Sequence, residues 1–368
     1  MTMAPPALPR LAILGSGWGS YSVFRNVDRK LYRVIVITPR NHFLFTPLLT
    51  STTVGTLEFR SIIEPIRNFR FRYPDDFHLA EAVGVDFAQR RVRCRSVLNS
   101  ALPAYDIEYD KLVIGVGMLP NTFGVPGVAE YAHFLKEITD ARAIRTKILS
   151  NIELSLEPGI GSSERQRLLH FVIVGGGPTG VEFGAELYDF VQQAAEVRVT
   201  LIESKDILAS FDDRLRAFAE RKIRQRKNFT LLKSIVTEVK EDCVILNGGE
   251  RLPCGLVVWS TGLSARPLTK SLAVELNKQG QIVTDDHLRI LTDKSGCSYA
   301  IGDCADITDK PLPCTAQVAE REGRYVAVSL NAAATGKPVT PFTFKSMGML
   351  AYIGEYQGLS DLPDFKLR

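Results

Sequence analysis

The chain of 368 residues lacks paired cysteines, a long apolar run and a concentration of charge. None of its six cysteines stands in a C-x-x-C pair, which argues against a zinc site or a thioredoxin-like pair and favours a reducing compartment. No apolar run approaches the roughly 20 residues needed to span a bilayer. The formal net charge is only +4, with Lys and Arg scattered, so no nucleic-acid partner is expected.

Two further features are missing from the chain. The five histidines show no metal-ligand spacing, so no metal site is expected. The opening "MTMAPPALPR" has no long apolar core and no extended Arg- and Ser-rich character, so no targeting sequence is visible. What is present is a globular composition, 45% hydrophobic and 23% charged, at a length sufficient for two domains.

The first informative stretch is "LAILGSGWGS", residues 11–20. A short apolar strand runs into Gly15 and Gly17, with Ser20 at a third position that requires a small residue. A helical segment follows, and then "YRVIVIT" (32–38) predicts a second buried strand. This order is typical of a dinucleotide-binding fold, in which the first glycine makes a tight turn and the second lets the backbone approach pyrophosphate.

The same unit recurs at "FVIVGGGPTG" (171–180), where Gly175, Gly177 and Gly180 keep the full spacing. Its second strand, "EVRVTLIE", ends at Glu203, where an acid can bind both ribose hydroxyls and repel a 2′-phosphate. The first copy has no such acid and ends near Arg40. Arg40 therefore indicates either NADP in the first unit or FAD with the arginine along its adenosine. Two copies in the right context predict a double Rossmann protein.

Three later stretches complete the pattern. "YDKLVIGVGMLPN" (109–121) and "GLVVWSTGLSARP" (255–267) each predict a buried strand that returns beside one nucleotide. "CSYAIGDCAD" (297–306) predicts another strand that ends in Gly302-Asp303. A carboxylate emerging there can accept a hydrogen bond from a sugar-alcohol chain.

Together these motifs resemble the flavoproteins with two dinucleotide-binding domains. Within them, "TPRNHFLFTPLLTSTTVGTLEFRSIIEPIR" (38–67), "PNTFGVPGV" (120–128) and "TAQVAEREG" (315–323) closely resemble type II NADH:quinone oxidoreductases, with the mitochondrial alternative NADH dehydrogenases as the nearest branch. The resemblance covers nearly the whole chain. The disulfide reductases of the superfamily carry a cysteine pair where this chain has "HFLFTPLL", which excludes their chemistry here.

The resemblance implies an α/β fold with two Rossmann-like domains, the NADH domain inserted in the FAD domain. The expected limits are 1–150 and 286–340 for the FAD domain, 165–285 for the NADH domain and 341–368 for the start of a C-terminal region that is incomplete. Hydride would pass from NADH to FAD, and two electrons would pass on to a quinone of the ubiquinone type.

The resemblance also implies the site residues. Those for FAD are Gly15, Gly17, Trp18, Gly19, Ser20, Arg40, Thr46, Gly117, Asp303, Ala316 and Gln317. Those for NADH are Gly175, Gly177, Pro178, Thr179, Gly180, Glu182, Glu203 and Gly262. Gln317, Glu320 and Arg321 would line the quinone pocket, and Glu182 and Gln317 are the catalytic candidates.

In the resembled family, the helix expected after Thr315 has the quinone-site pattern A-Q-x-A-x-Q. Thr315 is its expected N-cap, and the positive end of the helix dipole would stabilise an anionic reduced flavin. Gln317 matches the pattern, whereas Arg321 replaces its last glutamine. Arg321 would therefore either bind the quinone oxygen or turn to solvent.

The chain ends where membrane-binding amphipathic helices follow in the family. Peripheral association with the mitochondrial inner membrane is thus an inherited expectation, and a homodimer is another because the family often dimerises. The alternatives are an NADH-dependent flavoprotein with a protein acceptor, as in ferredoxin-type or apoptosis-inducing-factor-like reductases, or a catalytically silent truncated form. Sulfide:quinone chemistry is disfavoured because Cys304 and Cys314 are expected to be small buried residues.

Two acids follow the second glycine motif. Glu186 is expected to be an ordinary carboxylate that stabilises the helix through its dipole. In the resembled family the counterpart of Glu182 points towards the junction of nicotinamide and flavin. Partial desolvation there would raise the pKa of Glu182 and let it relay a proton during quinone reduction.

Overall fold

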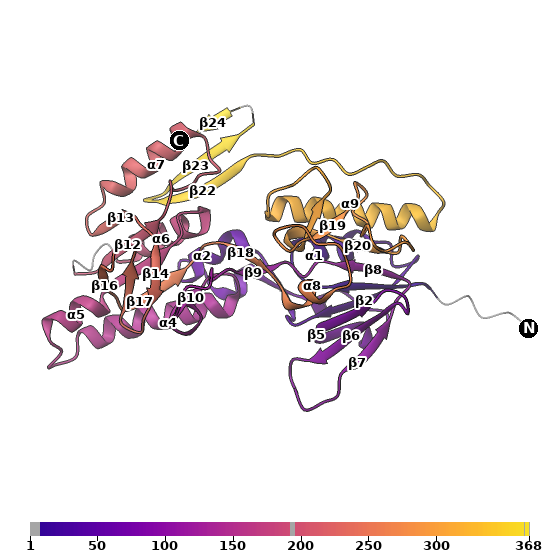
Figure 1. Cartoon of the computed structure of the whole chain (residues 1–368), viewed down its shortest axis with the longest axis horizontal. Helices are drawn as coiled ribbons and strands as arrows, with labels where there is room; N and C mark the ends of the chain where they lie inside the picture. The colour runs from indigo at the N-terminus through magenta and orange to yellow at the C-terminus, as the bar shows by residue number, and fades with distance from the viewer. Residues whose placement is uncertain (1–7, 192–195, 364, 368) are drawn as a thin grey trace, which may run out of the picture. The chain divides into compact units, whose positions relative to one another are not determined.

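A computed structural model describes residues 8–191, 196–363 and 365–367 (Figure 1). The chain forms two compact units, and each is discontinuous in sequence. Unit 1 comprises Met1–Leu44, Ile63–Leu119 and Ser264–Lys345, and unit 2 comprises Phe45–Ile62, Pro120–Leu263 and Ser346–Arg368. Among the described residues, no helix has the length and apolar character needed to cross a membrane.

Unit 1 is built on a seven-stranded sheet with the order β20-β8-β1-β2-β5-β6-β7. The strands from β20 to β5 run parallel, and β6 and β7 continue the sheet antiparallel. Its elements are β1 (Arg10–Leu14), α1 (Trp18–Asn26), β2 (Arg33–Thr38), β3 (His42–Leu44), β4 (Ile63–Pro65), η3 (Ile66–Asn68), η4 (Pro74–Asp76), β5 (Phe77–Asp86), β6 (Arg91–Ser96), β7 (Tyr105–Glu108), β8 (Lys111–Ile114), α8 (Pro267–Ser271), β19 (Ile282–Thr284), β20 (Ser298–Ala300), η5 (Gly302–Cys304), β21 (Ala305–Ile307) and α9 (Ala316–Ala334). Two short strands, β9 (Met118–Pro120) and β18 (Leu263–Ala265), fall where the chain passes from one unit to the other.

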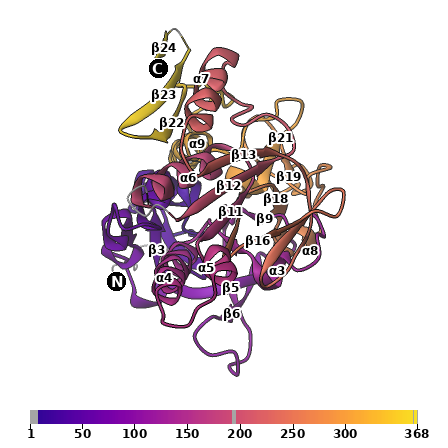
Figure 2. The same ribbon diagram turned by 90° about the vertical axis from the view of Figure 1, so that its left-hand side faces the viewer.

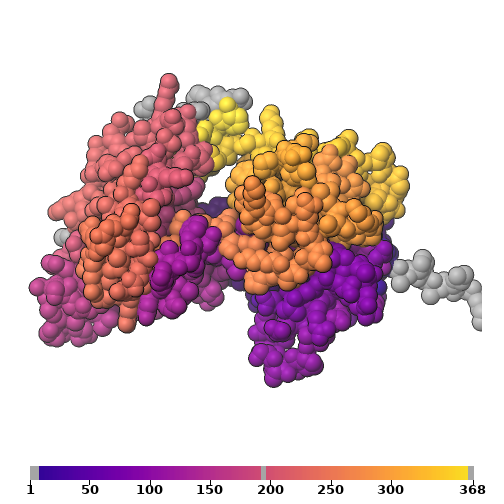
Figure 3. Space-filling view, in the orientation of Figure 1, coloured from indigo at the N-terminus to yellow at the C-terminus, as the bar shows by residue number. Residues whose placement is uncertain are grey.

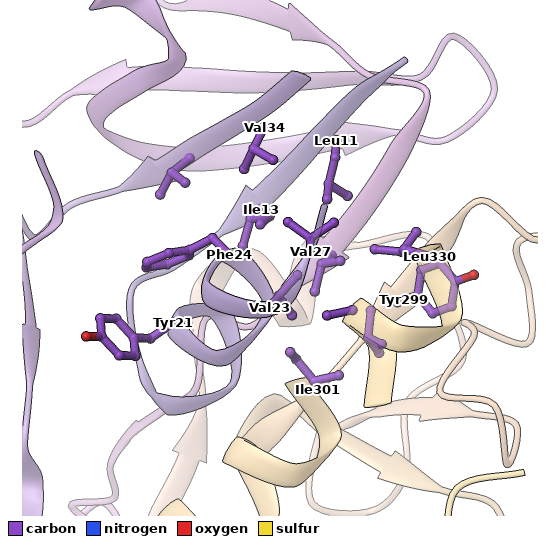
Figure 4. Close-up of a cluster of buried hydrophobic side chains, with 14 of the residues drawn as sticks. Leu11, Ile13, Tyr21, Val23, Phe24, Val27, Val34, Tyr299, Ile301 and Leu330 are labelled. Atoms are coloured by element: carbon purple, nitrogen blue, oxygen red, sulfur yellow. The ribbon is translucent and has the colours of Figure 1, made fainter. Parts of the chain in front are cut away.

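The central strand β1 is covered on both faces. Leu11 and Ile13 pack into one apolar cluster with α1 and α9, which Figure 4 shows. Ala12 and Leu14 point into a second cluster on the opposite face. Because parallel strands buried on both faces carry continuous apolar runs, "LAIL" forms a strand here rather than an amphipathic helix.

Unit 2 contains a second, fully parallel sheet with the order β10-β17-β11-β12-β13, and Figure 2 shows β11, β12 and β13 side by side. Its elements are η1 (Thr46–Leu48), α2 (Leu49–Thr52), η2 (Phe59–Ile62), α3 (Val128–Tyr131), β10 (His133–Phe134), α4 (Ile138–Ser155), α5 (Ser162–Leu168), β11 (His170–Val174), α6 (Pro178–Val191), β12 (Arg198–Glu203), α7 (Asp213–Arg224), β13 (Phe229–Lys233), β14 (Val236–Val239), β15 (Cys243–Leu246), β16 (Arg251–Pro253), β17 (Leu256–Trp259), β22 (Met349–Gly354), β23 (Gln357–Leu362) and β24 (Phe365–Leu367). The predicted α/β architecture with two Rossmann-like units is therefore confirmed.

The strands predicted to return beside each nucleotide are β8, which pairs with β1, and β17, which pairs with β11.

The last part of the chain folds onto unit 2 as an antiparallel sheet of β22, β23 and β24. β22 packs on α6 and β23 on α7, and the yellow atoms of this segment lie against the pink surface of α7 in Figure 3. The hydroxyl of Tyr352 donates to Asp189 Oδ2 at 2.6 Å, and the guanidinium of Arg226 donates to the carbonyl oxygen of Ile353. The Asp189 carboxylate on α6 and the buried Arg226 guanidinium after α7 therefore hold this C-terminal segment in place.

A buried histidine begins the central strand of unit 2. His170 is 3% exposed, with Nδ1 2.7 Å from the Pro253 carbonyl oxygen and Nε2 2.8 Å from Thr200 Oγ1. A carbonyl oxygen can only accept, so Nδ1 carries the proton and Nε2 accepts from the Thr200 hydroxyl. Burial lowers the pKa of His170 to about 4, so the ring is neutral in the folded protein at neutral pH.

The neutral state of His170 predicts a loss of stability in mild acid. The unfolded chain binds the proton near the usual pKa of about 6.5, so stability is full above that value and falls as the pH drops towards 4. We expect a loss of about 2 kcal/mol between pH 7 and pH 5, measured by denaturant unfolding. His170→Gln removes the titrating group and should flatten this part of the profile; an unchanged slope in the variant would assign it to other groups.

Candidate functional site

The first glycine loop of unit 1 joins β1 to α1. Gly15 has a φ of +101°, and a Cβ there would lie 2.4 Å from the carbonyl oxygen of Gly115. Gly17, the N-cap of α1, has no atom within 4 Å of an added Cβ. The loop is therefore closed on its protein side at Gly15 and open at Gly17, which is the form that a pyrophosphate at a helix N-terminus requires.

Ser20 fits the third position of this loop without strain. Its hydroxyl is fully buried and lies 3.1 Å from the carbonyl oxygen of Leu14 and 3.3 Å from that of Gly115. The serine thereby links the loop to the end of the neighbouring strand β8. Gly117, two residues further on, has a φ of +66° and open space where a Cβ would stand.

Trp18 and Gly19 follow in the first turn of α1. The Trp18 ring meets Phe43 edge to face, with ring centroids 5.1 Å apart. A Cβ on Gly19 would lie 2.9 Å from the Ile301 side chain and 3.2 Å from the Ala319 carbonyl oxygen. The glycine at position 19 therefore permits the close approach of α1 to Ile301 and to α9.

Arg40 lies beside the same loop. Its Nε is 3.3 Å from Ser16 Oγ, which in turn accepts from the Thr38 hydroxyl at 3.0 Å. The arginine is thus held at the end of β2, where the adenosine half of a bound dinucleotide reaches in this fold.

The turn η5 carries the predicted Asp303. Gly302 opens the turn with a φ of +70°, and the Gln281 amide donates to the carbonyl oxygen of Asp303 at 3.0 Å. Asp303 lines a small pocket, together with Asp306, Thr315 and Glu322.

A residue that sequence reasoning missed closes this pocket. Glu322 on α9 is 5% exposed, and its Oε2 accepts the Gly302 N–H at 2.6 Å. Burial raises the pKa of Glu322 to about 7; the bond from Gly302 opposes the shift, and the nearby Asp303 and Asp306 add to it. Glu322 lies one turn beyond Val318 on the buried side of α9, a spacing that could have indicated an inward carboxylate.

Helix α9 begins as predicted. Thr315 is its N-cap, with its hydroxyl 3.3 Å from the Val318 N–H. Ala316 and Gln317 occupy the first turn, and Arg321 lies one turn after Gln317, so the structure brings the pair to one face of the helix. Glu320 pairs with Arg324 at 3.3 Å. Cys304 is buried, but Cys314, just before the helix, is exposed, which corrects the expectation that it is a buried residue.

The second glycine loop, in unit 2, joins β11 to α6. A Cβ on Gly175 would lie 2.5 Å from the Ser260 carbonyl oxygen, and one on Gly180 would lie 2.0 Å from the Gly175 carbonyl oxygen. Gly177 again has no atom within 4 Å of an added Cβ. Pro178 and Thr179 are exposed on the first turn of α6. The same pattern of closed and open glycines therefore appears in both units.

Glu203 ends β12 beside this loop. Its Oε2 accepts the Gly176 N–H at 2.7 Å, and its Oε1 accepts from the Lys205 N–H at 2.9 Å. Burial alone would raise its pKa, but these bonds outweigh burial and leave the pKa below its usual value. Glu203 is thus a carboxylate held in a fixed orientation at the end of β12, beside the glycine loop.

Gly262 and Thr46 are two further predicted positions of unit 2. Gly262 has a φ of +70°, and a Cβ there would lie 2.3 Å from the Phe123 ring. Thr46 is exposed in the short helix η1. Of the predicted FAD residues, Thr46 therefore belongs to unit 2, and the others belong to unit 1.

Glu182 lies on the first turns of α6 and is mostly buried. Its Oε1 accepts the backbone N–H of Tyr352 in β22 at 3.3 Å. Burial raises the pKa of Glu182 to about 7; the Tyr352 N–H opposes this shift and the charge of Glu186 adds to it. The carboxyl group is therefore able to gain and lose a proton near neutral pH.

Glu186, one turn further, is not an ordinary helix-stabilising acid. It is 8% exposed, and its carboxylate accepts from the hydroxyls of Ser51 and Thr56 at 2.6 and 2.8 Å. No local sequence pattern could have shown this, because both partners stand at least 130 residues earlier in the chain.

Comparison with known proteins agrees with this geometry. The chain belongs to the pyridine nucleotide-disulphide oxidoreductase family, whose model matches residues 9–323. It is 43% identical over 371 residues to a probable NADH dehydrogenase of Dictyostelium discoideum, covering 97% of this chain and 82% of the relative. It is 41% identical over 390 residues to the mitochondrial internal alternative NAD(P)H-ubiquinone oxidoreductase A1 of Arabidopsis thaliana, covering 97% and 76%.

Within that family, the chain falls in the branch of the alternative, type II NADH dehydrogenases. The solved structure of NDH2 from Plasmodium falciparum in complex with NADH superposes with a TM-score of 0.90 at 28% identity, covering 98% of this chain and 91% of that one. The resemblance inferred from the sequence motifs is confirmed.

Proposed function

We propose that the protein is a non-proton-pumping NADH:quinone oxidoreductase. One hydride from NADH and one proton together reduce a quinone to its quinol, and NAD⁺ is released. The observation that carries this proposal is that identity of 41–43% to NADH and NAD(P)H-ubiquinone oxidoreductases extends over 97% of the chain. Both glycine loops and Glu203 lie within that span.

FAD fits the glycine loop of unit 1, within the expected FAD-domain limits 1–150 and 286–340. When bound, FAD accepts the hydride of NADH and passes two electrons to the quinone. Gly15 and Gly17 would receive its pyrophosphate at the N-terminus of α1, where the open space at Gly17 admits a ligand, and the buried Ser20 would hold the loop against β8. Asp303 would accept from its ribityl hydroxyls, and Arg40 would lie along its adenosine.

NADH fits the second loop, within the expected limits 165–285. Gly175, Gly177 and Gly180 would hold its pyrophosphate, and Glu203 would accept from both ribose hydroxyls. The charge of Glu203 would also repel a 2′-phosphate, which favours NADH over NADPH.

The quinone side is assigned to α9. Gln317 would donate to a quinone carbonyl oxygen, and Arg321, one turn away, would form the outer wall of the pocket with Glu320. Glu182 would relay the proton that the quinone takes up, since its pKa of about 7 lets it exchange protons at neutral pH.

The mitochondrial names of the relatives support a mitochondrial location for this protein. Peripheral attachment to the inner membrane and assembly as a homodimer are further parts of the proposal, since both come from the family resemblance. A ubiquinone-like acceptor agrees with both.

The function is tested by an anaerobic titration of the purified protein. NADH should bleach the flavin absorbance near stoichiometry, and a short-chain quinone should restore it. A flavin that bleaches but is reoxidised only by a ferredoxin-type protein would overturn the quinone assignment. Protein that takes up neither FAD nor NADH would instead support a silent form.

A further inference from the structure

Helix α6 carries three acids, Glu182, Glu186 and Asp189, and each receives hydrogen bonds from a segment remote in sequence. Glu182 and Asp189 receive them from the C-terminal segment, through Tyr352 and Glu355. Glu186 receives them from Phe45–Ile62, the first segment of unit 2. The proposed function uses Glu182 but gives no role to Glu186.

Each carboxylate oxygen of Glu186 accepts a hydrogen bond from a hydroxyl of this segment. Ser51 Oγ donates to its Oε1 at 2.6 Å, and Thr56 Oγ1 donates to its Oε2 at 2.8 Å. A carboxylate that is 8% exposed has lost most of its hydration, so it depends on these donors. Hydrogen bonds to a charged acceptor are the stronger kind, and removal of one partner leaves the other unsatisfied.

Two other hydroxyls of the same segment, those of Thr52 and Thr53, bond within the segment itself. Thr52 Oγ1 donates to the Leu49 carbonyl oxygen at 2.7 Å, and Thr53 Oγ1 donates to that of Thr50 at 2.5 Å. They close the turn α2 on itself. The hydroxyls of Ser51 and Thr56, in contrast, reach Glu186 on α6.

The segment also packs against α4. A Cβ on Gly55 would lie 2.7 Å from the Arg145 guanidinium, and the Gly55 φ of +88° suits glycine. The guanidinium carbons of Arg142 and Arg145 lie 5.0 and 5.8 Å from the centroid of the Phe59 ring. Glu186 therefore holds the middle of the segment, and α4 holds its later part.

We propose that Glu186 is a positioning residue that fixes Phe45–Ile62 on α6 and, through it, the location of Thr46. This inference rests on the proposed function in one respect, because it takes Thr46 as one of the FAD contacts that the family resemblance implies. Glu186 itself touches neither substrate nor cofactor in this scheme.

Hydrogen exchange of the whole protein tests this attachment of Phe45–Ile62 to α6, called the clamp below, independently of FAD. The Leu57 N–H donates to the Ser51 carbonyl oxygen at 3.2 Å and the Thr53 N–H to that of Thr50 at 3.1 Å, so these amides report on the segment. In Glu186→Met, and in the Ser51→Ala, Thr56→Val double variant, exchange across residues 49–57 should be about tenfold faster. A peptide from β11 should exchange as in the wild type.

Two conservative variants serve as matched controls. In Glu186→Gln the amide oxygen accepts from one hydroxyl, and the amide group donates to the other, which can rotate. Thr56→Ser keeps the hydroxyl that Thr56→Val removes. Both controls should stay within about twofold of the wild-type exchange rate.

The consequence for FAD is measured as flavin fluorescence released on dilution of the holoprotein. Glu186→Met and the double variant should release FAD about tenfold faster, whereas Glu186→Gln and Thr56→Ser should match the wild type. Wild-type exchange in Glu186→Met would overturn the clamp. Faster exchange with unchanged FAD release would overturn its effect on Thr46, and wild-type protein that holds no FAD would contradict the proposed function instead.

Discussion

Gly323→Ala should prevent the protein from accumulating with bound FAD. A Cβ at Gly323 would stand 2.2 Å from the carbonyl oxygen of Gly19 and 2.8 Å from Ser22 Cβ. Both obstacles belong to α1, and a backbone oxygen cannot rotate away. Helix α9 would have to move off α1, and the apolar cluster of Leu11, Ile13 and Leu330 beneath the two helices would open.

The expected loss of stability is at least about 2–3 kcal/mol, the upper range for overpacking a core. Because both helices carry proposed FAD contacts at their first turns, the flavin should be lost along with the packing. The measurements are the melting temperature and the ratio of flavin to protein after purification.

Gly161→Ala is the matched control for this change. Gly161 has a φ of −66° and nothing within 4 Å of an added Cβ. Because Gly161 is the N-cap of α5, where alanine is a poorer residue than glycine, its replacement should cost about 1 kcal/mol at most and leave the core packing intact. If Gly323→Ala melted like Gly161→Ala and kept a full complement of flavin, the close contact of α1 and α9 would not limit the fold.

The parts of the molecule that sequence reasoning predicted are those fixed by local chemistry. The spacing of Gly175, Gly177 and Gly180 follows from a single turn between a strand and a helix, so the motif carries its own structural context. The N-cap at Thr315 is likewise a local matter between a hydroxyl and an amide three residues on. Once two Rossmann-like units were predicted, β8 and β17 were expected to pair with the first strand of their own unit, and they do.

The parts that were missed depend on distant partners. Glu186 and Glu322 are both buried, and their contacts come from residues 135 and 20 positions away. A glutamate in a helix is ordinarily exposed. The spacing of Glu322 from Val318 on α9 could have indicated an inward carboxylate, but nothing in the sequence indicated the partner of either acid. Only the folded structure shows their partners. Glu186, which was expected to stabilise its helix through the dipole, instead makes a tertiary contact with Ser51 and Thr56.

Glu182→Gln should lower turnover with a quinone acceptor by about a hundredfold, the lower range for removal of a positioned proton donor. Gln keeps the oxygen that accepts the Tyr352 N–H at 3.3 Å in the wild type, so the seat of β22 on α6 should survive. FAD content and the affinity for NADH should match the wild type, because the glycine loop and Glu203 are unchanged.

The pH profile separates the proton relay from a structural role. Burial, with the charge of Glu186, raises the pKa of Glu182 to about 7, so the group carries its proton below that pH and loses it above. Wild-type turnover should therefore fall as the pH rises through about 7, whereas the variant should be slow and flat across the range. Steady-state assays from about pH 5.5 to 8.5 would show the difference.

The stability of the Glu182→Gln variant should change in the opposite direction to its turnover. Loss of folded protein would therefore not explain the slower turnover. A carboxyl whose folded pKa exceeds its unfolded value of 4.5 stabilises the fold below that value, and this contribution is lost as the pH rises through about 7. Gln carries no charge to desolvate, so at pH 8 the variant should be more stable than the wild type, by up to about 3 kcal/mol. A variant that is slower yet more stable at pH 8 would assign the proton to Glu182, and equal rates with equal pH profiles would leave Glu182 only its contact with Tyr352.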